Sequence, residues 1–213
     1  MSYVAFPPQT PDIFGPIITG RDVRLALDTT IQSWAPTYLP DLANLSGLTI
    51  TGFGSWEAQY QNRALPAGEQ VACWSTCAGT DPKHPPLRQG DGTYSAVWLA
   101  QSNLVVYGKD WAEAADLMAV YMAAVRAAAV QHGSLGGFAT STRWIGETTK
   151  EMEHQATRTV QGGIVLFGIL VDGAVNALAG PKTLPSGPPV APGTSAGPTV
   201  DEVSVTVEKE ASS

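Results

Sequence analysis

The stretch that decides the fold runs from residue 93 to residue 133, TYSAVWLAQSNLVVYGKDWAEAADLMAVYMAAVRAAAVQHG. Its first half, Tyr94–Tyr107, is rich in β-branched and aromatic residues and predicts a long strand. Its second half predicts a helix from Asp110 to about His132. Asp110 and Glu113 have the spacing of a capping box, and Gly133 stands where a helix-ending glycine is expected. A strand followed directly by a long helix fits an α+β domain.

The apolar side chains of the expected helix share one face. They recur at three- and four-residue spacing, which is the pattern of an amphipathic helix packed on a core. We therefore expect core packing for this face and no cofactor site on it. Its members are Trp111, Ala114, Met118, Tyr121, Val125 and Ala128.

Upstream of the long strand, Gln70–Thr76 (QVACWST) predicts another strand, and Ala78–Thr93 predicts a long loop rich in proline and glycine. Two strands joined by such a loop indicate an antiparallel pair whose loop forms a flap. The charged and imidazole groups of this flap are candidate contacts for a partner, and an ordinary solvated loop is the alternative. They are Asp81, Lys83, His84, Arg88 and Asp91.

Nearer the N-terminus, a helix is expected to begin at Asp22, because aspartate caps helices well. Pro36 and Pro40 are expected to limit or kink this helix, and Gly47 to end the region. Its apolar stripe at helical spacing consists of Val23, Leu27, Ile31 and Trp34.

Two further strands are expected after the SLGG turn, over Ala139–Glu151 and Arg158–Val171. Gly162 and Gly163 indicate a bulge or a close backbone approach. The apolar end of the last strand predicts a central strand covered on both faces. The expected fold is therefore α+β, with a mixed or antiparallel sheet of about four strands and helices on one face.

The composition divides the chain into three parts. Residues 1–20 carry four prolines and predict an extended arm, residues 21–179 form the α+β core, and residues 180–213 form a tail. The tail begins with a Pro/Gly-rich linker, which behaves as a semi-rigid spacer. Beyond this linker, Val203, Val205 and Val207 alternate with polar residues between acidic flanks, so we expect a short strand that pairs with a neighbouring subunit.

Charge and hydropathy exclude some classes of function. The net charge is −7, and the twelve basic residues are scattered along the chain. Tight nucleic-acid binding needs a basic face, so it is not expected, although DNA sliding past without sticking is compatible with this balance. The best apolar run, Ile164–Val171, is far shorter than the roughly 20 residues of a membrane span. We expect a chain made in a cytoplasm, without secretion signal or membrane anchor.

The residues that could carry catalysis do not form a recognisable constellation. His84 lies in the flap, His132 at a helix C-terminus that favours a cation, and His154 beside Glu151 and Glu153 at spacings that differ from HExxH. No GxxxxGK[ST] or GxGxxG phosphate motif is present. We expect no metal, no cofactor and no enzyme, with a small α+β hydrolase or ligand-binding protein as the alternative of a different class.

The succession of elements and three segments of the chain resemble the tail terminator proteins of long-tailed bacteriophages of actinobacterial hosts. The likeness covers residues 20–181. It is carried by QVACWST with the loop and DGTYSAVWLAQSNLVVYGKD, by AVYMAAVRAAAVQHGSLGG with TRWIGE, and by RTVQGGIVLFGILVDGAVNALAGP. The arm and the Pro-rich tail lie outside the shared pattern.

The resemblance implies a structural virion protein without turnover. A homo-hexameric ring would cap the tail tube and join it to the head–tail connector, with DNA passing through its lumen. Other neck or head-completion rings share this size and role and are the alternative. Ring closure needs head-to-tail contacts between two different patches, for which the sheet edges and both arms are candidates. The tryptophans at 56, 74, 98 and 144 are expected in the core more than at interfaces.

Overall fold

The computed structural model describes residues 17–56, 70–151 and 159–176. Most of the expected arm (residues 1–20) lies outside the described residues, as do His154, the tail (residues 180–213) and its valines Val203, Val205 and Val207. The described residues confirm the α+β class, with two helices and an antiparallel sheet of five strands.

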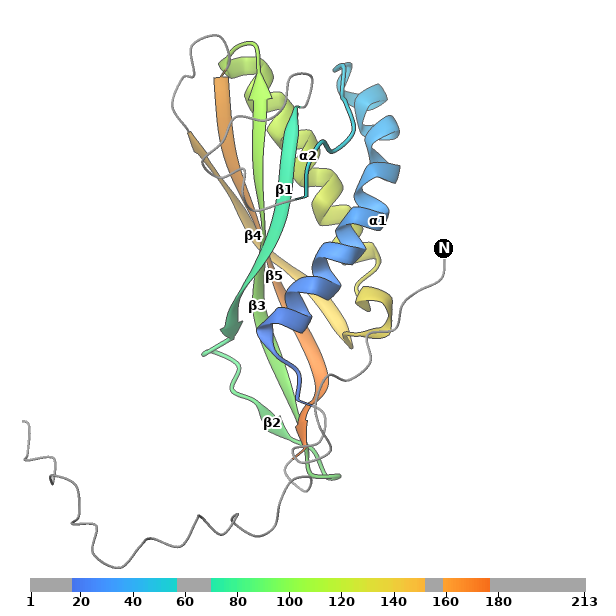
Figure 1. The fold of residues 1–213 in the computed structure, drawn as a ribbon, viewed down its shortest axis with the longest axis vertical. Coiled ribbons are helices and arrows are strands. Elements are labelled where there is room, and N and C mark those ends of the chain that lie inside the picture. Colours follow the sequence, from blue (N-terminus) through green and yellow to red (C-terminus); the bar gives the residue numbers. More distant parts are fainter. Residues whose placement is uncertain (1–16, 57–69, 152–158, 177–213) are drawn as a thin grey trace, which may run out of the picture. The chain divides into compact units, whose positions relative to one another are not determined.

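The elements follow one another in nearly the predicted order. They are α1 (Gly20–Ser46), β1 (Val71–Thr80), β2 (Leu87–Arg88), β3 (Thr93–Gly108), α2 (Trp111–Gln131), the 3₁₀ turn η2 (Leu135–Gly137), β4 (Ser141–Glu151) and β5 (Thr159–Asn176). The sheet order is β1-β3-β5-β4, and β2 pairs with β3 (Figure 1). The short β2 lies inside the predicted loop, which is why the strand number exceeds the expected four.

Helix α1 begins two residues before the predicted start. Thr19 is the N-cap, and the Asp22 carboxylate accepts hydrogen bonds from the Thr19 backbone N–H at 2.8 Å and from its hydroxyl at 2.6 Å. Asp22 is therefore the third helical residue, and from within the first turn its carboxylate accepts a hydrogen bond from the N-cap N–H. The predicted stop is confirmed, since Gly47 closes the helix with a left-handed φ of 69°.

The two prolines do not end α1, which continues through Pro36 and Pro40 to Ser46. Each proline removes one backbone N–H, so one carbonyl a turn earlier loses its helical partner. The carbonyls concerned are those of Gln32, which is exposed, and of Pro36, which is half-buried. Ala35 and Leu39, next to the prolines in the sequence, are buried and keep the helix on the core.

Helix α2 has the predicted start, because the Asp110 side chain accepts a hydrogen bond from the Glu113 backbone N–H at 2.9 Å. Its end differs from the prediction in one respect. Gly133 follows the C-cap His132 but has no left-handed φ; the left-handed residues come later, at Leu135, Gly136 and Gly137. Gly133 instead lies close under β4, and its carbonyl accepts a hydrogen bond from the Thr142 hydroxyl.

The main core lies between the two helices and one face of the sheet, as Figure 1 shows. The predicted helix faces are confirmed with one exception each, because Trp34 and Trp111 are more than a third exposed while the others are buried. Alternate residues of the strands complete the layer. The largest fully buried side chains are Tyr121, Phe167, Leu27, Ile31, Leu104, Leu117, Met118, Ile169, Val23, Val71, Val106 and Val125.

Strand β5 lies centrally between β3 and β4, as its apolar sequence predicts. Its helix-facing side chains, such as Val165 and Phe167, are fully buried. On the other face Ile164, Leu166 and Leu170 are only half-buried. The strand was expected to be covered on both faces, but only its helix-facing side is fully covered.

The paired glycines of β5 mark a close approach, since the bulges of the sheet lie elsewhere. A Cβ added at Gly163 would lie 2.5 Å from the Met118 sulfur and 3.1 Å from the Met122 sulfur. Helix α2 can therefore pack closely against β5 only where the strand has no side chain.

Replacing Gly163 by alanine should destabilise the fold by about 1–3 kcal/mol, because the added methyl group displaces two buried thioethers. Gly146→Ala is the matched control, since nothing lies within 4 Å of the corresponding Cβ position. Urea denaturation measures both free energies of unfolding. Equal values for the two variants would contradict the close approach.

Candidate partner-contact surface

The outer edge of β1 is closed by two segments of the same chain. At one end, the Gly54 N–H donates to the Val71 carbonyl at 3.0 Å, and the Cys73 N–H donates to the Ser55 carbonyl at 2.9 Å. Further along, the Ser75 N–H donates to the Asp28 carboxylate of α1 at 2.8 Å. An unpaired edge strand offers backbone groups to other chains, so these contacts remove β1 from that role over Val71–Ser75.

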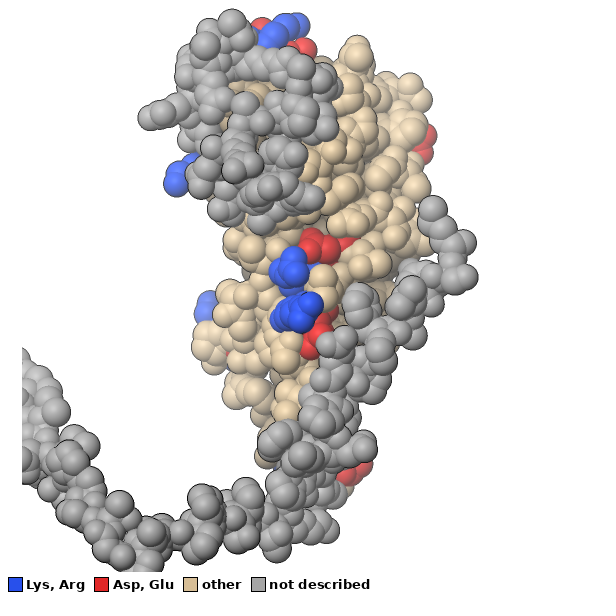
Figure 2. Space-filling view, in the orientation of Figure 1, with Lys and Arg blue, Asp and Glu red and all other residues tan. Residues whose placement is uncertain are grey.

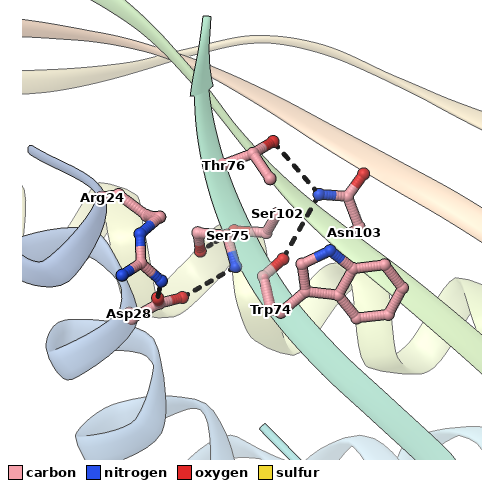
Figure 3. Close-up of polar contacts among 7 residues, drawn as sticks. All are labelled: Arg24, Asp28, Trp74, Ser75, Thr76, Ser102 and Asn103. Carbon is pink, nitrogen blue, oxygen red and sulfur yellow. Dashed lines mark hydrogen bonds and ion pairs between the residues drawn. The ribbon is translucent and has the colours of Figure 1, made fainter. Parts of the chain in front are cut away.

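Asp28 is held in place from both sides, as Figure 3 shows. Arg24 contacts its other carboxylate oxygen at 3.2 Å, and the Ser75 hydroxyl lies 3.1 Å from the buried hydroxyl of Ser102. Burial raises the pKa of Asp28, and the hydrogen bonds from Ser75 and the charge of Arg24 only partly offset this shift. The carboxylate charge is therefore a cost to the fold, whereas its acceptor oxygen is needed.

Asp28→Ala should destabilise the protein by about 1–3 kcal/mol, because the Ser75 N–H loses its partner at the sheet edge. Asp28→Asn keeps an acceptor without a charge and should stay within about 0.5 kcal/mol of the parent at pH 7. Since the folded-state pKa of Asp28 is raised, the parent should gain on the asparagine variant as the pH falls through that pKa. Urea denaturation at pH 7 and pH 4 measures this order. An asparagine variant as unstable as the alanine variant would contradict it.

The predicted flap (Ala78–Thr93) is anchored near its start, at the residue that follows β1. Asp81 is 6% exposed, and one of its carboxylate oxygens accepts a hydrogen bond from His84 Nδ1 at 2.7 Å. The other accepts from the Lys83 N–H at 2.9 Å, and Arg143 Nη2 lies 3.5 Å from the carboxylate. The hydrogen bond from His84, above all, lowers the pKa of Asp81, with smaller contributions from the Lys83 N–H and the Arg143 charge. Asp81 is therefore an ionised group that anchors the flap within the chain.

Arg143 reaches this anchor from the other edge of the sheet. It belongs to β4, and its side chain crosses β5 at Gly168, where an added Cβ would lie 2.7 Å from Nε. Neither residue was singled out from the sequence. The sequence signal for this contact is Gly168 itself, a glycine in an otherwise apolar strand. Such a glycine indicates that another group approaches the backbone closely, but it does not indicate which residue does so.

The other candidate residues of the flap do not converge on one site. Asp91 shapes a local turn, since its Oδ1 accepts hydrogen bonds from the Thr93 N–H and hydroxyl, and these bonds lower its pKa. Arg88 is exposed on β2, and the Lys83 side chain is exposed. Of the five predicted residues, only Asp81 and His84 are brought together.

Arg143→Gln should loosen the flap without unfolding the sheet, because the anchor loses the charge that crosses β5. Trypsin at neutral pH should then cleave after Lys83 and Arg88 faster than in the parent, as mass spectrometry of the fragments measures. Lys150→Gln on the same strand is the control and should leave the cleavage rate unchanged. The anchor should also depend on pH. Because the pKa of Asp81 is lowered, its ionised carboxylate stabilises the folded flap above about pH 4, and this stabilisation is lost as the pH falls through that pKa. An unchanged rate in Arg143→Gln would show that the crossing contact does not hold the flap.

The outer edge of β4 differs from that of β1. Within residues 17–56, 70–151 and 159–176, β4 pairs with β5 and with no other strand. Trp144 and Ile145, at a bulge in this strand, are each 47% exposed, which corrects the expected core role of Trp144. Trp74 is buried, and Trp56 and Trp98 are partly buried, as expected. Beside the bulge, Arg126 of α2 lies over the Trp144 ring at 4.8 Å and pairs with Glu147 at 2.8 Å.

The described histidines make structural contacts. His84 contacts Asp81, whereas His132 stacks on Trp34 at 3.8 Å between ring centroids and lies 3.2 Å from the Tyr38 hydroxyl. These are the contacts of a loop anchor and of a helix end. Among the described residues, no group of three or more His, Cys, Asp or Glu side chains is placed to hold a metal ion.

The surface carries few charges. Figure 2 shows one face on which most described side chains are uncharged, with the charged ones gathered mainly around the first turns of α1. No helix in the described part of the chain is long and apolar enough to cross a membrane.

No family model and no curated protein sequence matches the chain. Among solved structures, it is similar to a chain of the "Virion of native gene transfer agent (GTA) particle", with a TM-score of 0.36 and 16% sequence identity. The match covers 67% of this chain and 94% of that chain. A TM-score this low does not establish a common fold, so this likeness assigns no function.

Proposed function

We propose that the chain is a structural virion protein, the tail terminator of a long-tailed bacteriophage. Copies form a hexameric ring that caps the tail tube and joins it to the head–tail connector. The protein is made in the host cytoplasm and is located in the virion. It needs no cofactor and catalyses no reaction.

The observation that carries the proposal is the difference between the two edges of the sheet. Hydrogen bonds within the chain close β1 over Val71–Ser75, whereas β4 is open in the described residues and has Trp144 and Ile145 exposed beside it. Tryptophan and arginine are enriched among the residues that dominate binding at interfaces, and Arg126 lies over Trp144. One open and one closed edge favour head-to-tail contacts, which generate rings, over face-to-face dimers.

The element order and the surface charge support the same function. The order from α1 to β5 agrees with the tail-terminator pattern on which the resemblance rests. The net charge of −7 suits a channel through which DNA passes without binding. In this proposal, the flap over residues 81–92 and the strand at Val203, Val205 and Val207 provide contacts to partners.

Mass measurement tests the ring. Native mass spectrometry of the full chain, alone and with isolated tail tubes, should show six copies. Ile145→Asp should weaken this assembly while the circular dichroism spectrum stays unchanged, because a carboxylate then lies at the open edge. Leu45→Asp is the matched control, since Leu45 is 85% exposed at the end of α1, away from β4.

A monomer or dimer under every condition, including with tail tubes, would contradict the ring and favour the enzyme or ligand-binding alternative. A ring that joins the head connector but never contacts the tail tube would favour another neck protein. A hexamer unaffected by Ile145→Asp would exclude the β4 edge from its interfaces.

A further inference from the structure

The open edge of β4 has a regular part of defined length. After the bulge at Trp144–Gly146, residues Glu147–Glu151 pair one to one with Val165–Gln161 of β5 without further register shifts. These five residues present their outer backbone groups on the side away from β5. A straight, unpaired strand segment can accept one more strand by main-chain hydrogen bonds.

A flank of small apolar residues on α2 lies beside this edge. Arg126 marks the position, because it pairs with Glu147 of β4. Ala119, Ala123 and Val130 stand seven and three residues before and four residues after Arg126, and therefore on the same side of the helix. Ala119 and Val130 are exposed and Ala123 is half-buried.

The other side of α2 sets the direction of this flank. Met118 and Met122 stand eight and four residues before Arg126 and lie over Gly163 of β5. The methionines therefore face β5, and Arg126, further around the helix, faces β4. The alanine flank lies further around in the same direction and so faces the space beyond the outer edge of β4. The backbone edge of Glu147–Glu151 and the alanine flank of α2 therefore border the same side of the sheet, and we call the position between them the notch.

The tail of the chain carries a segment with matching chemistry. Val203, Val205 and Val207 alternate with Ser204 and Thr206 over five residues. As a strand, this segment turns its three valines to one face and its hydroxyls to the other. The valines suit the alanine flank, and the hydroxyls suit solvent on the opposite side of the sheet.

We propose that residues 203–207 of a second copy bind in this notch as an added strand next to Glu147–Glu151. The inference deepens the proposed function and rests on it, because the ring supplies the second copy. Residues 177–202 separate the segment from β5 and span about 80 Å when extended. The return along the chain's own β5, from Asn176 to Gln161, is about 50 Å. The spacer carries six prolines and is long enough to reach beyond the chain's own β5 to a neighbouring copy, and the dilution experiment below separates that copy from the chain's own tail.

Hydrogen exchange of the full chain tests the proposal. In assembled protein, the amides of residues 147–151 that point away from β5 should be protected, and dilution to monomer should remove this protection. Val205→Pro removes a strand N–H and should speed exchange of these amides about tenfold or more in the assembled sample. Val190→Pro is the matched control, because the same substitution then falls inside the Pro-rich linker.

Each result decides between named possibilities. Equal protection of residues 147–151 in the parent and in Val205→Pro, within an intact ring, would overturn the notch and leave the ring standing. Tail-dependent protection that persists in dilute monomer would show that the chain's own tail fills the notch, and would overturn the second copy. A chain that never assembles would fail the proposed function, whatever its exchange pattern.

Discussion

Backbone hydrogen-bonding groups at the edge of a β-sheet must find partners, and this constraint orders much of the structure. The Asp28 carboxylate satisfies the Ser75 N–H at the edge of β1 while burial works against its charge. The geometry of α1 follows, because Asp28 lies on the turn after Val23 and beside Leu27, both buried against the sheet. One carboxylate thus joins the packing of the first helix to the closure of one sheet edge.

Local patterns predicted the elements well. The capping chemistry at Asp110, the β-branched run of Tyr94–Tyr107 and the apolar run of β5 each reflect forces within a few residues of one another, which a single sequence displays. Predictions failed where tertiary packing outweighed a local sequence preference. Pro36 and Pro40 were expected to limit or kink α1; they do not end it, because Ala35 and Leu39 are buried and keep the helix on the core up to and beyond these positions.

The partner-contact surface was harder to predict, because it depends on residues far apart in the sequence. Asp81 was identified as a flap residue, yet one of its contacts is Arg143, sixty-two positions later, whose side chain reaches it over the missing side chain at Gly168. Trp144 was expected in the core, as the other tryptophans were, because tryptophan is more often a core residue than an interface residue. Its exposure follows from β4 lying at the end of the sheet order, which no local pattern encodes.

The opposite pKa shifts of Asp28 and Asp81 give the molecule an order of events in acid. Protonation of Asp28 removes a buried charge, and the neutral carboxyl still has a carbonyl oxygen for the Ser75 N–H. Protonation of Asp81 weakens its attraction to the charged groups around it. Below about pH 4 the flap would therefore loosen, while β1 kept its hydrogen bond to Asp28 over Val71–Ser75.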